Sequence, residues 1–506
     1  MSRTQRPPNI LIFMTDQEQS DVSLPGNACQ TPNADRLARE GVQFTNAYCP
    51  TAHCCPARAS LMTGVYPSIH GVYNNIANPT AIRRAPRPGL PMFSEGLREA
   101  GYRMIYSGKW HVSMEEGPGD RGWEELVVTG GKGAGQARGP ELFQRTRAES
   151  AGVGDSSGGE RPWGVVRRPG WGDYTLFRTL PTQGNLGYDE KPDWRVVSPA
   201  LGALEQLTKS ADPWCLYVGP IGPHDPFHVP DVFVNRYNLA DVPLPASYHD
   251  SCEDKPRTYQ RMRQQYWDQL SEEEIRDAVR HYWAYCTMED TYFGLFLDAL
   301  DASGQREDTL VVRLSDHGEY AGAHGLFCKG VPAFREGYNV PCIMSWPGGV
   351  QQPGRVEDSF VTLADIGPTL LDVAGVPVPD GLTGRSMAPF LQGEQPEGWR
   401  DAFYSQMNGV ELYYTQRTVQ TKEWKYVYNG FDFDELYDLR ADPHETVNLA
   451  AKREYDEVKR ELVHKMWQFA HETNDHIFNG YATVAFAPWG PADAEYAPRV
   501  TPPARE

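Results

Sequence analysis

The sequence predicts an α/β protein with a large, mostly parallel sheet sandwiched by helices, followed by a smaller C-terminal α+β domain. Three observations lead to this fold class. Short apolar runs of strand length alternate with helical segments that end at glycine. The run at 9–15 is continuous and apolar, as in a strand buried on both faces, and 309–315 is a second strand of this central type. After about residue 395 the pattern changes to short strands typical of an antiparallel sheet.

The elements of the first domain follow from apolar runs and from helix start and stop signals. Strands are expected at Asn9–Thr15, Val42–Tyr48, Tyr102–Ser107, Trp214–Gly219 and Thr309–Ser315. Helices are expected at Pro32–Glu40, Pro56–Thr63, Leu90–Ala100, Ser271–Ala302 and Thr362–Val373. A first-turn proline opens the first helix, and a capping box of Ser271 and Glu274 opens the fourth.

Two domains are predicted, with a boundary between residues 395 and 396. Residues 1–395 form the α/β domain, and a variable insertion at about 112–200 carries the Gly-rich stretches 130–139 and 151–162. Residues 396–506 form the smaller domain. Its expected elements are three strands, a helix and an extended tail: Phe403–Met407, Thr415–Gln420, Lys425–Tyr428, Glu454–Glu472 and 485–506.

Composition and charge exclude several classes of protein. Hydrophobic residues make up 40% of the chain, which permits a sizeable core. The 48 Lys+Arg against 67 Asp+Glu give a net charge of −19, which excludes the basic face of a nucleic-acid binder. No apolar run reaches the length of a membrane span, and Ile10–Met14 is too short for the core of a signal peptide. We therefore expect a cytoplasmic protein without a nucleic-acid or membrane partner.

Polar residues follow both apolar strands at the point where each strand ends. Asp16 and Gln17 come directly after the first strand, and Asp316 and His317 come after the second. Ligand sites in open α/β sheets lie at the carboxyl ends of strands. Two carboxylates with an amide and an imidazole beside them can hold a divalent cation. The alternative interpretation is that both aspartates only cap loops.

The segment Cys54-Cys55-Pro56-Ala57-Arg58 opens the second helix. It places a thiol at a helix N-terminus, where backbone N–H groups and the helix dipole favour an anion. Arg58 lies one turn further along the same side. Two simpler interpretations are an ordinary helix with a buried cysteine and a strained disulfide between Cys54 and Cys55. The nine cysteines, odd in number and irregularly spaced, do not indicate a disulfide framework.

This segment and the following Thr63-Gly64 match C-x-P-[S/A]-R and T-G, and so resemble the signature of the type I sulfatases of the alkaline-phosphatase superfamily. Further blocks resemble the family in the same order: TPNADRLAREGVQFTNAY (31–48), YPSIHGVYNN (66–75), GYRMIYSGKWH (101–111), PHDPF (223–227), SDHGEYAGAHGLFCKG (315–330) and ELYDLRADPHETVNL (435–449). The resemblance covers the chain apart from 112–200 and the last residues, and it implies an alkaline-phosphatase-like fold.

The resemblance also implies a modified nucleophile and a cation. Cys54 would be oxidised to formylglycine by a separate formylglycine-generating enzyme, and one hydroxyl of the hydrated aldehyde would attack sulfur. Cys55 occupies the free position of the motif. One divalent cation would be held by residue 54 and by Asp16, Gln17, Asp316 and His317. Calcium is the first expectation, and manganese is the alternative because an imidazole ligand suits it better.

The remaining site residues are likewise implied by the resemblance. Lys109 and His111 would contact the sulfate and the nucleophile, and Arg58 would hold the hydroxyl of residue 54. His224 would lie near the leaving oxygen, and Lys329 on the sulfate oxygens. Where many sulfatases have two consecutive acids, this chain has Asp16-Gln17, a form that is similar to phosphonate monoester hydrolases and choline sulfatases as much as to arylsulfatases.

The resemblance therefore implies a sulfuric ester hydrolase, similar to arylsulfatases, that cleaves the S–O bond of a small-molecule or oligosaccharide sulfate monoester. A phosphonate monoester or phosphodiester hydrolase using the same site is the alternative, and an anion-binding protein with unmodified Cys54 is a third possibility. Trp163, Trp171 and Tyr174 either line a substrate pocket or anchor a loop. The tail 485–506 either packs on a second subunit in a homo-oligomer or is a mobile terminus.

Overall fold

The computed structural model describes residues 7–24, 26–78, 80–131, 160–168, 172–182, 192–409, 413–475, 477 and 489–494. Most of the Gly-rich stretches expected to form surface loops, most of the expected extended tail and Trp171 lie outside these residues.

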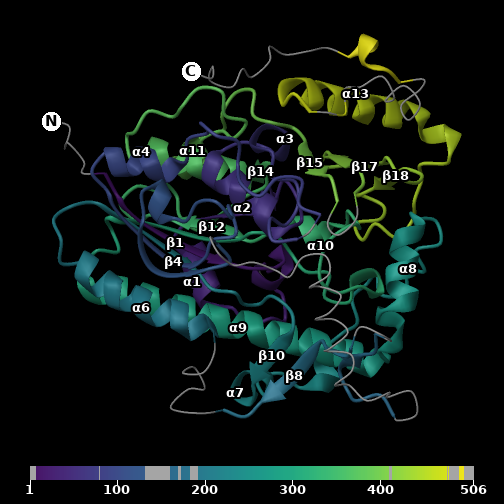
Figure 1. Ribbon diagram of the computed structural model, residues 1–506, viewed down its shortest axis with the longest axis horizontal. Helices are drawn as coiled ribbons and strands as arrows, with labels where there is room; N and C mark the ends of the chain where they lie inside the picture. The colour runs from purple at the N-terminus through teal and green to yellow at the C-terminus, as the bar shows by residue number, and fades with distance from the viewer. Residues whose placement is uncertain are drawn as a thin grey trace.

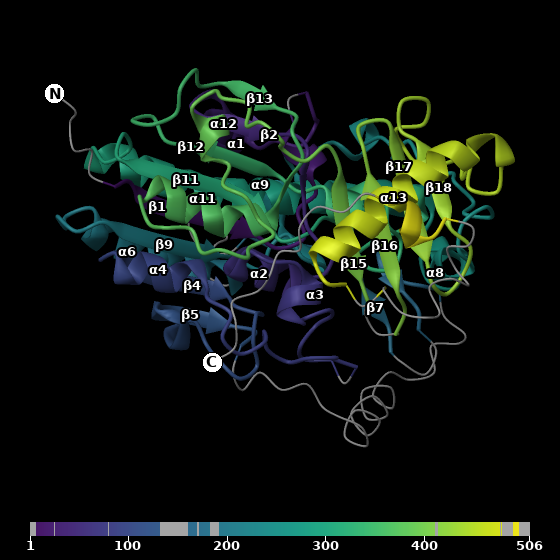
Figure 2. The ribbon, with the colours of Figure 1, turned by 90° about the horizontal axis from the view of Figure 1, so that it is seen from above.

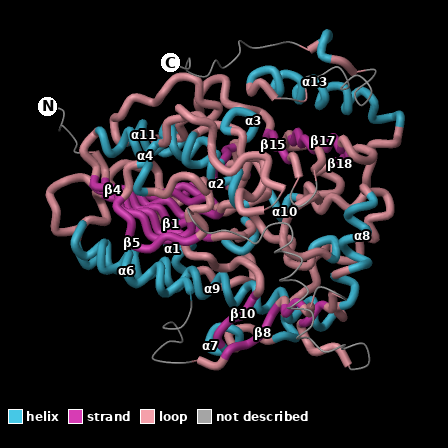
Figure 3. Tube along the Cα trace, viewed as in Figure 1, coloured by secondary structure: helices cyan, strands magenta, loops and turns pink. Residues whose placement is uncertain are grey.

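The centre of the molecule is an eight-stranded sheet in the order β13-β2-β12-β11-β1-β9-β4-β5. The strands around β1, β4 and β5 lie side by side in the magenta group of Figure 3. Its strands are β1 Asn9–Thr15, β2 Val42–Phe44, β4 Arg103–Lys109, β5 Glu124–Thr129, β9 Trp214–Gly219, β11 Thr309–Ser315, β12 Cys342–Ser345 and β13 Arg355–Glu357. Within this sheet β12 runs antiparallel to β11 and β2, and the other neighbours are parallel. The sheet is therefore mixed and mostly parallel, as expected.

Helices cover both faces of the sheet (Figure 1). On one face lie α1 Pro32–Arg39, α6 Pro192–Leu207 and α9 Glu272–Ser303, and on the other lie α2 Cys54–Thr63, α4 Phe93–Glu99 and α11 Ile366–Val373. The alternation of side chains along β1 explains the two layers. Leu11 and Phe13 pack with the first set of helices, and Ile10, Ile12 and Met14 pack with the second.

Helix α2 begins at Cys54, earlier than the predicted start at Pro56. Proline is tolerated inside the first turn because the first N–H groups of a helix have no intrahelical partner. The helix ends at Gly64, whose φ of 70° is the left-handed conformation that favours glycine. The thiol of Cys54 is thus at the helix N-terminus, as the sequence indicates.

Smaller elements connect these layers. They are β3 Ala47–Tyr48, β6 Val165–Val166, β7 Tyr174–Thr175, β8 Phe177–Leu180, β10 Phe227–Pro230, β14 Val361–Thr362, α3 Pro67–His70, α7 Asp231–Val234, α8 Arg257–Gln265, α10 Arg335–Tyr338 and α12 Ala388–Leu391.

A separate four-stranded antiparallel sheet follows, in the order β15-β16-β17-β18, beside helix α13 (Figure 2). The elements are β15 Phe403–Met407, β16 Gln416–Gln420, β17 Trp424–Asn429, β18 Glu435–Asp438 and α13 Asp456–Glu472. Val419, Tyr426 and Leu436 of the sheet share an apolar cluster with Leu462 and Val463 of the helix. The predicted fold class is confirmed. The boundary between residues 395 and 396 stays a prediction.

Three departures from the predicted elements have physical causes. Helix α6 lies partly inside the predicted insertion, because its buried apolar face packs against the sheet although Pro192 and Pro199 interrupt the local pattern. The predicted strand Val42–Tyr48 divides into β2 and β3, which join different sheets. Strand β18 is too short to give a local signal and is formed by pairing with β17.

Membrane-spanning helices and disulfides are both absent from the described residues. No helix there is long and apolar enough to cross a membrane. All nine cysteines are described, and each is a free thiol, including the adjacent pair Cys54 and Cys55.

A buried ion pair joins the small sheet to the end of α13, and its removal tests this packing. Arg417 Nε and Nη2 lie 2.6 and 2.7 Å from the two carboxylate oxygens of Asp475. Arg417→Leu leaves that carboxylate buried without a cation, which costs about 3–5 kcal/mol. We expect a lower midpoint of urea unfolding for this variant. In the control, Arg440→Leu removes an exposed pair with Glu423 and costs under about 1 kcal/mol. Equal losses of stability in the two variants would show that the buried pair contributes no more to stability than the exposed one.

Candidate active site

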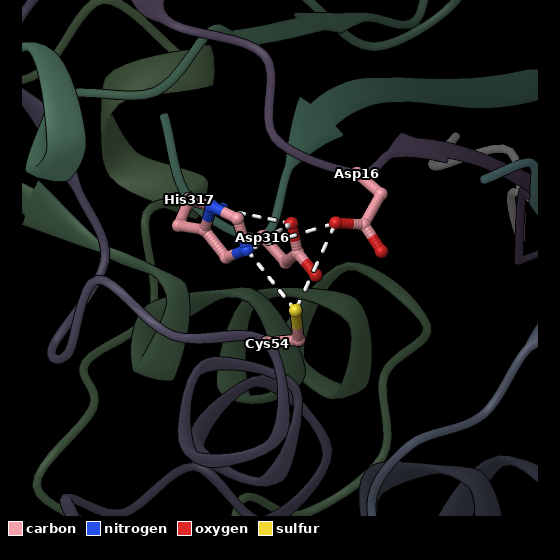
Figure 4. Close-up of side chains that lie close together, drawn as sticks. All are labelled: Asp16, Cys54, Asp316 and His317. Atoms are coloured by element: carbon pink, nitrogen blue, oxygen red, sulfur yellow. Dashed lines mark hydrogen bonds and ion pairs between the residues drawn. The ribbon is translucent and has the colours of Figure 1, made fainter. Parts of the chain in front are cut away.

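Four side chains that the sequence singles out converge at one point (Figure 4). Asp16 follows β1, Cys54 opens α2, and Asp316 and His317 follow β11. Their potential ligand atoms all lie within 4.8 Å of one another, and all four residues are buried. The Cys54 Sγ is 3.2 Å from His317 Nε2, which in turn is 3.6 Å from an Asp16 oxygen and 3.7 Å from an Asp316 oxygen.

Strand register brings the two aspartates together although 300 residues separate them. Thr15 at the end of β1 pairs with Ser315 at the end of β11, so the next residue of each strand emerges at the same edge of the sheet. The same edge receives Lys109 at the end of β4 and the loop that carries His224 after β9. The site is thus built at the carboxyl ends of parallel strands.

Two cations face the two carboxylates. Arg58 donates from Nε to Asp316 at 2.7 Å and from Nη2 to Asp16 at 3.4 Å, and Lys109 donates to Asp16. Burial and the neighbouring Cys54 raise the pKa of Asp16, but Lys109, His224 and Arg58 outweigh them and hold that pKa well below its usual value. Asp16 is therefore ionised, as a cation ligand must be.

The thiol of Cys54 lies in a positive environment. Burial alone raises the pKa of Cys54, but Lys109, Lys329 and His317 together with a contact to His111 lower it well below its usual value. Cys55 behaves differently, because burial raises the pKa of its thiol and its sulfur accepts a hydrogen bond from the backbone N–H of Ile76. Only the first thiol of the pair faces the site.

His224 and Lys329 lie together on another side of Cys54. The Lys329 Nζ is 2.6 Å from His224 Nε2, and His224 also contacts Cys54. The Nδ1 of His224 is 2.7 Å from the backbone oxygen of Asp225. A carbonyl oxygen only accepts, so Nδ1 carries a proton and Nε2 accepts from Lys329 in this arrangement.

The side chain of Gln17 is oriented by acidic neighbours. Its Nε2 donates to Asp225 at 2.8 Å and to Glu319, and its oxygen accepts from Lys329. Burial raises the pKa of Asp225, but His224 and Lys329 outweigh it and hold that pKa below its usual value, so Asp225 is ionised and only accepts hydrogen bonds. Asp225 therefore requires the NH₂ of Gln17 to face it, which turns the amide oxygen towards Lys329. The backbone of Gln17 has a φ of 69°, and its N–H donates to Asp316. Coordination of a cation by Gln17 stays a prediction.

Several residues that support this site were not anticipated from the sequence. Asp225 and Glu319 stand beside motif histidines, so the PHDPF and SDHGEY blocks contained a signal for them. The sequence contained no such signal for Tyr106 and Tyr217, since both lie in apolar runs that form strands. Their rings stack at 4.4 Å; Tyr217 accepts from Arg58 at 3.2 Å, and Tyr106 donates to the Lys109 backbone oxygen at 2.6 Å.

The chemistry of the donor set fits a divalent cation. The Nδ1 of His317 is 2.9 Å from the backbone oxygen of Gly318, which fixes a proton on that nitrogen and leaves the lone pair of Nε2 facing the carboxylates. Two carboxylates and this imidazole nitrogen are ligands for calcium or manganese.

Comparisons with known proteins agree with this architecture. A sequence model of the sulfatase family matches residues 8–376, and one described as N-sulphoglucosamine sulphohydrolase, C-terminal, matches residues 322–472. The chain is 30% identical to the choline-sulfatase of Rhizobium meliloti (strain 1021), over 88% of this chain and 83% of that protein. It is 26% identical to the N-acetylglucosamine-6-O-sulfatase of Bacteroides thetaiotaomicron, over 96% and 89%.

A similar solved structure is the phosphonate monoester hydrolase of Agrobacterium radiobacter. It superposes with a TM-score of 0.71 and 25% identity, covering 91% of this chain and 94% of that one. The family model spans well over half of the chain, so this protein belongs to the sulfatase family, within the alkaline-phosphatase superfamily. The predicted enzyme class, a sulfuric ester hydrolase, is confirmed.

Proposed function

We propose that this enzyme hydrolyses an organic sulfate monoester by cleaving the S–O bond, with residue 54 as the nucleophile. The observation that carries the proposal is the meeting of the Cys54 thiol with Asp16, Asp316 and His317 in one buried cluster. Five further polar side chains surround the cluster, as the family resemblance implies: Arg58, Lys109, His111, His224 and Lys329.

The reactive form of residue 54 is proposed to be formylglycine, made by a separate formylglycine-generating enzyme. When hydrated, this group supplies one hydroxyl to attack sulfur and a second whose ionisation expels sulfate and restores the aldehyde. Arg58, held by Asp316, is expected to orient residue 54 from one helical turn away. His111 contacts the same side chain and is expected to exchange protons with it.

The cation is proposed to be held by Asp16, Gln17, Asp316, His317 and residue 54. When bound, it adds positive charge at the sulfate and acidifies the hydroxyl of residue 54. Calcium is the first expectation and manganese the alternative. In either case the carboxylates of Asp16 and Asp316 are the acidic ligands that the cation requires.

Lys109 and Lys329 are proposed to stabilise the sulfate oxygens. Burial lowers the pKa of each lysine, but nearby acidic groups, including Asp16 and Cys54, outweigh it, so both pKa values lie above the usual one. Both side chains are therefore charged across the physiological pH range. Fixed charges that already face the reacting group need no reorganisation as the transition state forms.

We assign protonation of the leaving oxygen, which releases the organic half, to the side of the site where His224 and Lys329 lie. Burial and Lys329 lower the pKa of His224, but Asp225, Asp16 and its contact with Cys54 raise it above its usual value overall. An imidazole in this position can hold a proton for the leaving oxygen once its Nε2 is released from Lys329. Lys329 is the other candidate donor, since its Nζ occupies the same position.

The alternative function is hydrolysis of a phosphonate monoester or phosphodiester at the same site. The similarity to the Agrobacterium radiobacter enzyme favours it, because that structure covers nearly the whole chain. An anion-binding role with unmodified Cys54 is the weaker alternative. The relatives named choline-sulfatase and N-acetylglucosamine-6-O-sulfatase support either a small-molecule or a saccharide substrate. A homo-oligomer stays a prediction.

A substrate panel with matched cysteine variants tests the nucleophile and the reaction class. Protein co-expressed with a formylglycine-generating enzyme should show residue 54 as an aldehyde by mass spectrometry, and should prefer aryl or alkyl sulfates over phenylphosphonate and phosphodiesters. Cys54→Ala should abolish turnover, and Cys55→Ala should keep most of it. A dead Cys55→Ala variant would refute the nucleophile, and a preference for phosphonate would establish the alternative function.

Replacement of single carboxylates tests the cation site. Asp16→Asn and Asp316→Asn each remove one negative ligand, so both should lower metal occupancy and activity together. Elemental analysis of the purified protein gives the identity and stoichiometry of the ion. The matched control is Asp401→Asn, whose exposed carboxylate pairs only with Lys465 among the described residues and should keep full occupancy. Two zinc ions per chain would contradict the single-cation site.

A leaving-group series tests which residue donates the proton. Alkoxides are poorer leaving groups than nitrophenolate, so loss of a general acid, worth roughly 10²–10⁴-fold, should be largest for alkyl sulfates. We expect His224→Ala to lower kcat/KM for alkyl sulfates far more than for nitrophenyl sulfate, and Lys329→Ala to lower both by similar factors. The opposite result would assign the general acid to Lys329: His224→Ala would lower kcat/KM equally for all leaving groups, and Lys329→Ala would make kcat/KM depend more steeply on leaving-group basicity.

A further inference from the structure

The hairpin of β6 and β7 reaches the candidate active site through Tyr174. Val166 pairs with Tyr174 across the hairpin, and the Tyr174 hydroxyl donates to a carboxylate oxygen of Asp225. The other oxygen of Asp225 accepts from Gln17 and lies 3.3 Å from His224 Nδ1. Tyr174 therefore lies next to His224, on the side of the site to which we assign departure of the organic half.

The guanidinium of Arg168 covers the ring of Tyr174. Its Cζ lies 5.4 Å from the ring centroid, within the range of a cation–π contact. The Nε donates to the backbone oxygen of Gly172 at 2.9 Å, and the side chain also hydrogen-bonds to Tyr266, whose ring is 6.5 Å from that of Tyr174. Two tyrosines and a carbonyl thus hold Arg168 in place.

No carboxylate of the described residues neutralises the positive charge of Arg168. Among the described residues none forms an ion pair with it, and its contacts are the neutral groups just named. Asp225, the carboxylate that Tyr174 contacts, is already occupied by Tyr174, Gln17 and His224. Arg168 is only partly buried, and beyond its contacts with Gly172 and Tyr266 its guanidinium has N–H groups without a partner among the described residues.

We infer that Arg168 is a specificity-determining residue that binds an anionic group on the organic half of the substrate. This inference rests on the proposed function and names the substrate class: sulfate esters that carry a second anion, a carboxylate or another sulfate. A planar guanidinium with free N–H groups matches either anion.

The same geometry disfavours a cationic organic half. A quaternary ammonium group is recognised on open aromatic faces. Here the face of Tyr174 carries Arg168, whose charge repels a second cation. The structure therefore points away from the cationic substrate of the choline-sulfatase relative and towards an acidic saccharide or aryl ester.

Three aryl sulfates that differ in charge test this inference on the matured enzyme: 4-carboxyphenyl, phenyl and 4-(trimethylammonio)phenyl sulfate. Each substrate is compared with itself across variants, so differences in leaving-group basicity cancel. Arg168→Gln should lower kcat/KM about 10-fold for the carboxylate, leave phenyl sulfate within about two-fold, and raise the value for the ammonium substrate. Arg168→Lys should keep most of the preference for the carboxylate.

The matched control is Arg178→Gln, which removes the same charge from an exposed position on the neighbouring strand β8. It should leave all three values unchanged. Added NaCl should reduce the carboxylate preference of the unsubstituted enzyme and have little effect in Arg168→Gln, since salt screens a partly exposed pair. An equal change for all three substrates in Arg168→Gln, or a preference of the unsubstituted enzyme for the ammonium substrate, would overturn the inference.

Binding to Cys54→Ala separates this inference from the proposed function. Calorimetry with 4-carboxyphenyl sulfate and phenyl sulfate requires no turnover. The role of Arg168 is supported if Cys54→Ala binds the carboxylate compound more tightly than phenyl sulfate and the Cys54→Ala/Arg168→Gln double variant does not. This result would hold even if the enzyme does not hydrolyse sulfate esters. Equal binding of both compounds overturns it, whereas absence of sulfate turnover in the matured enzyme overturns only the proposed function.

Discussion

The register between β1 and β11 is the constraint on which the site depends. Pairing of Thr15 with Ser315 places two carboxylates side by side at one edge of the sheet. A shift by one residue would turn one of them to the opposite face and would also exchange the two buried apolar faces of the strand. The packing of Ile10, Leu11, Ile12 and Phe13 against helices on both sides therefore protects the geometry of the site.

Two adjacent buried carboxylates are unfavourable unless cations compensate them. Arg58 comes from helix α2 and Lys109 from β4, and each contacts Asp16. The two supports are themselves linked, since Arg58 donates to the Lys109 backbone oxygen at 2.8 Å. An acidic protein thus concentrates positive charge around one thiol, which is the environment that an anionic ester requires.

The proposed reaction site and the proposed determinant of substrate choice lie in different parts of the fold. The cluster around Cys54 stands on the ends of central strands and on one buried helix, which hold it rigidly. Arg168 and Tyr174 stand on a small hairpin whose strands are two residues each. The Tyr174 contact with Asp225 connects the two parts. Such a hairpin can change its side chains without disturbing the central sheet, which suits a determinant of substrate choice.

The sequence by itself determined the strands Asn9–Thr15, Trp214–Gly219 and Thr309–Ser315, because short and largely apolar runs of this length indicate strands in a large core. It also named the four residues that meet in one cluster, Asp16, Cys54, Asp316 and His317, since each lies in a local motif. Only the tertiary structure decided which way Gln17 turns, that Asp225 joins His224 to Tyr174, and that Arg168 has no acidic partner among the described residues. These features depend on contacts between segments far apart in the chain, and local sequence carries no record of such distances.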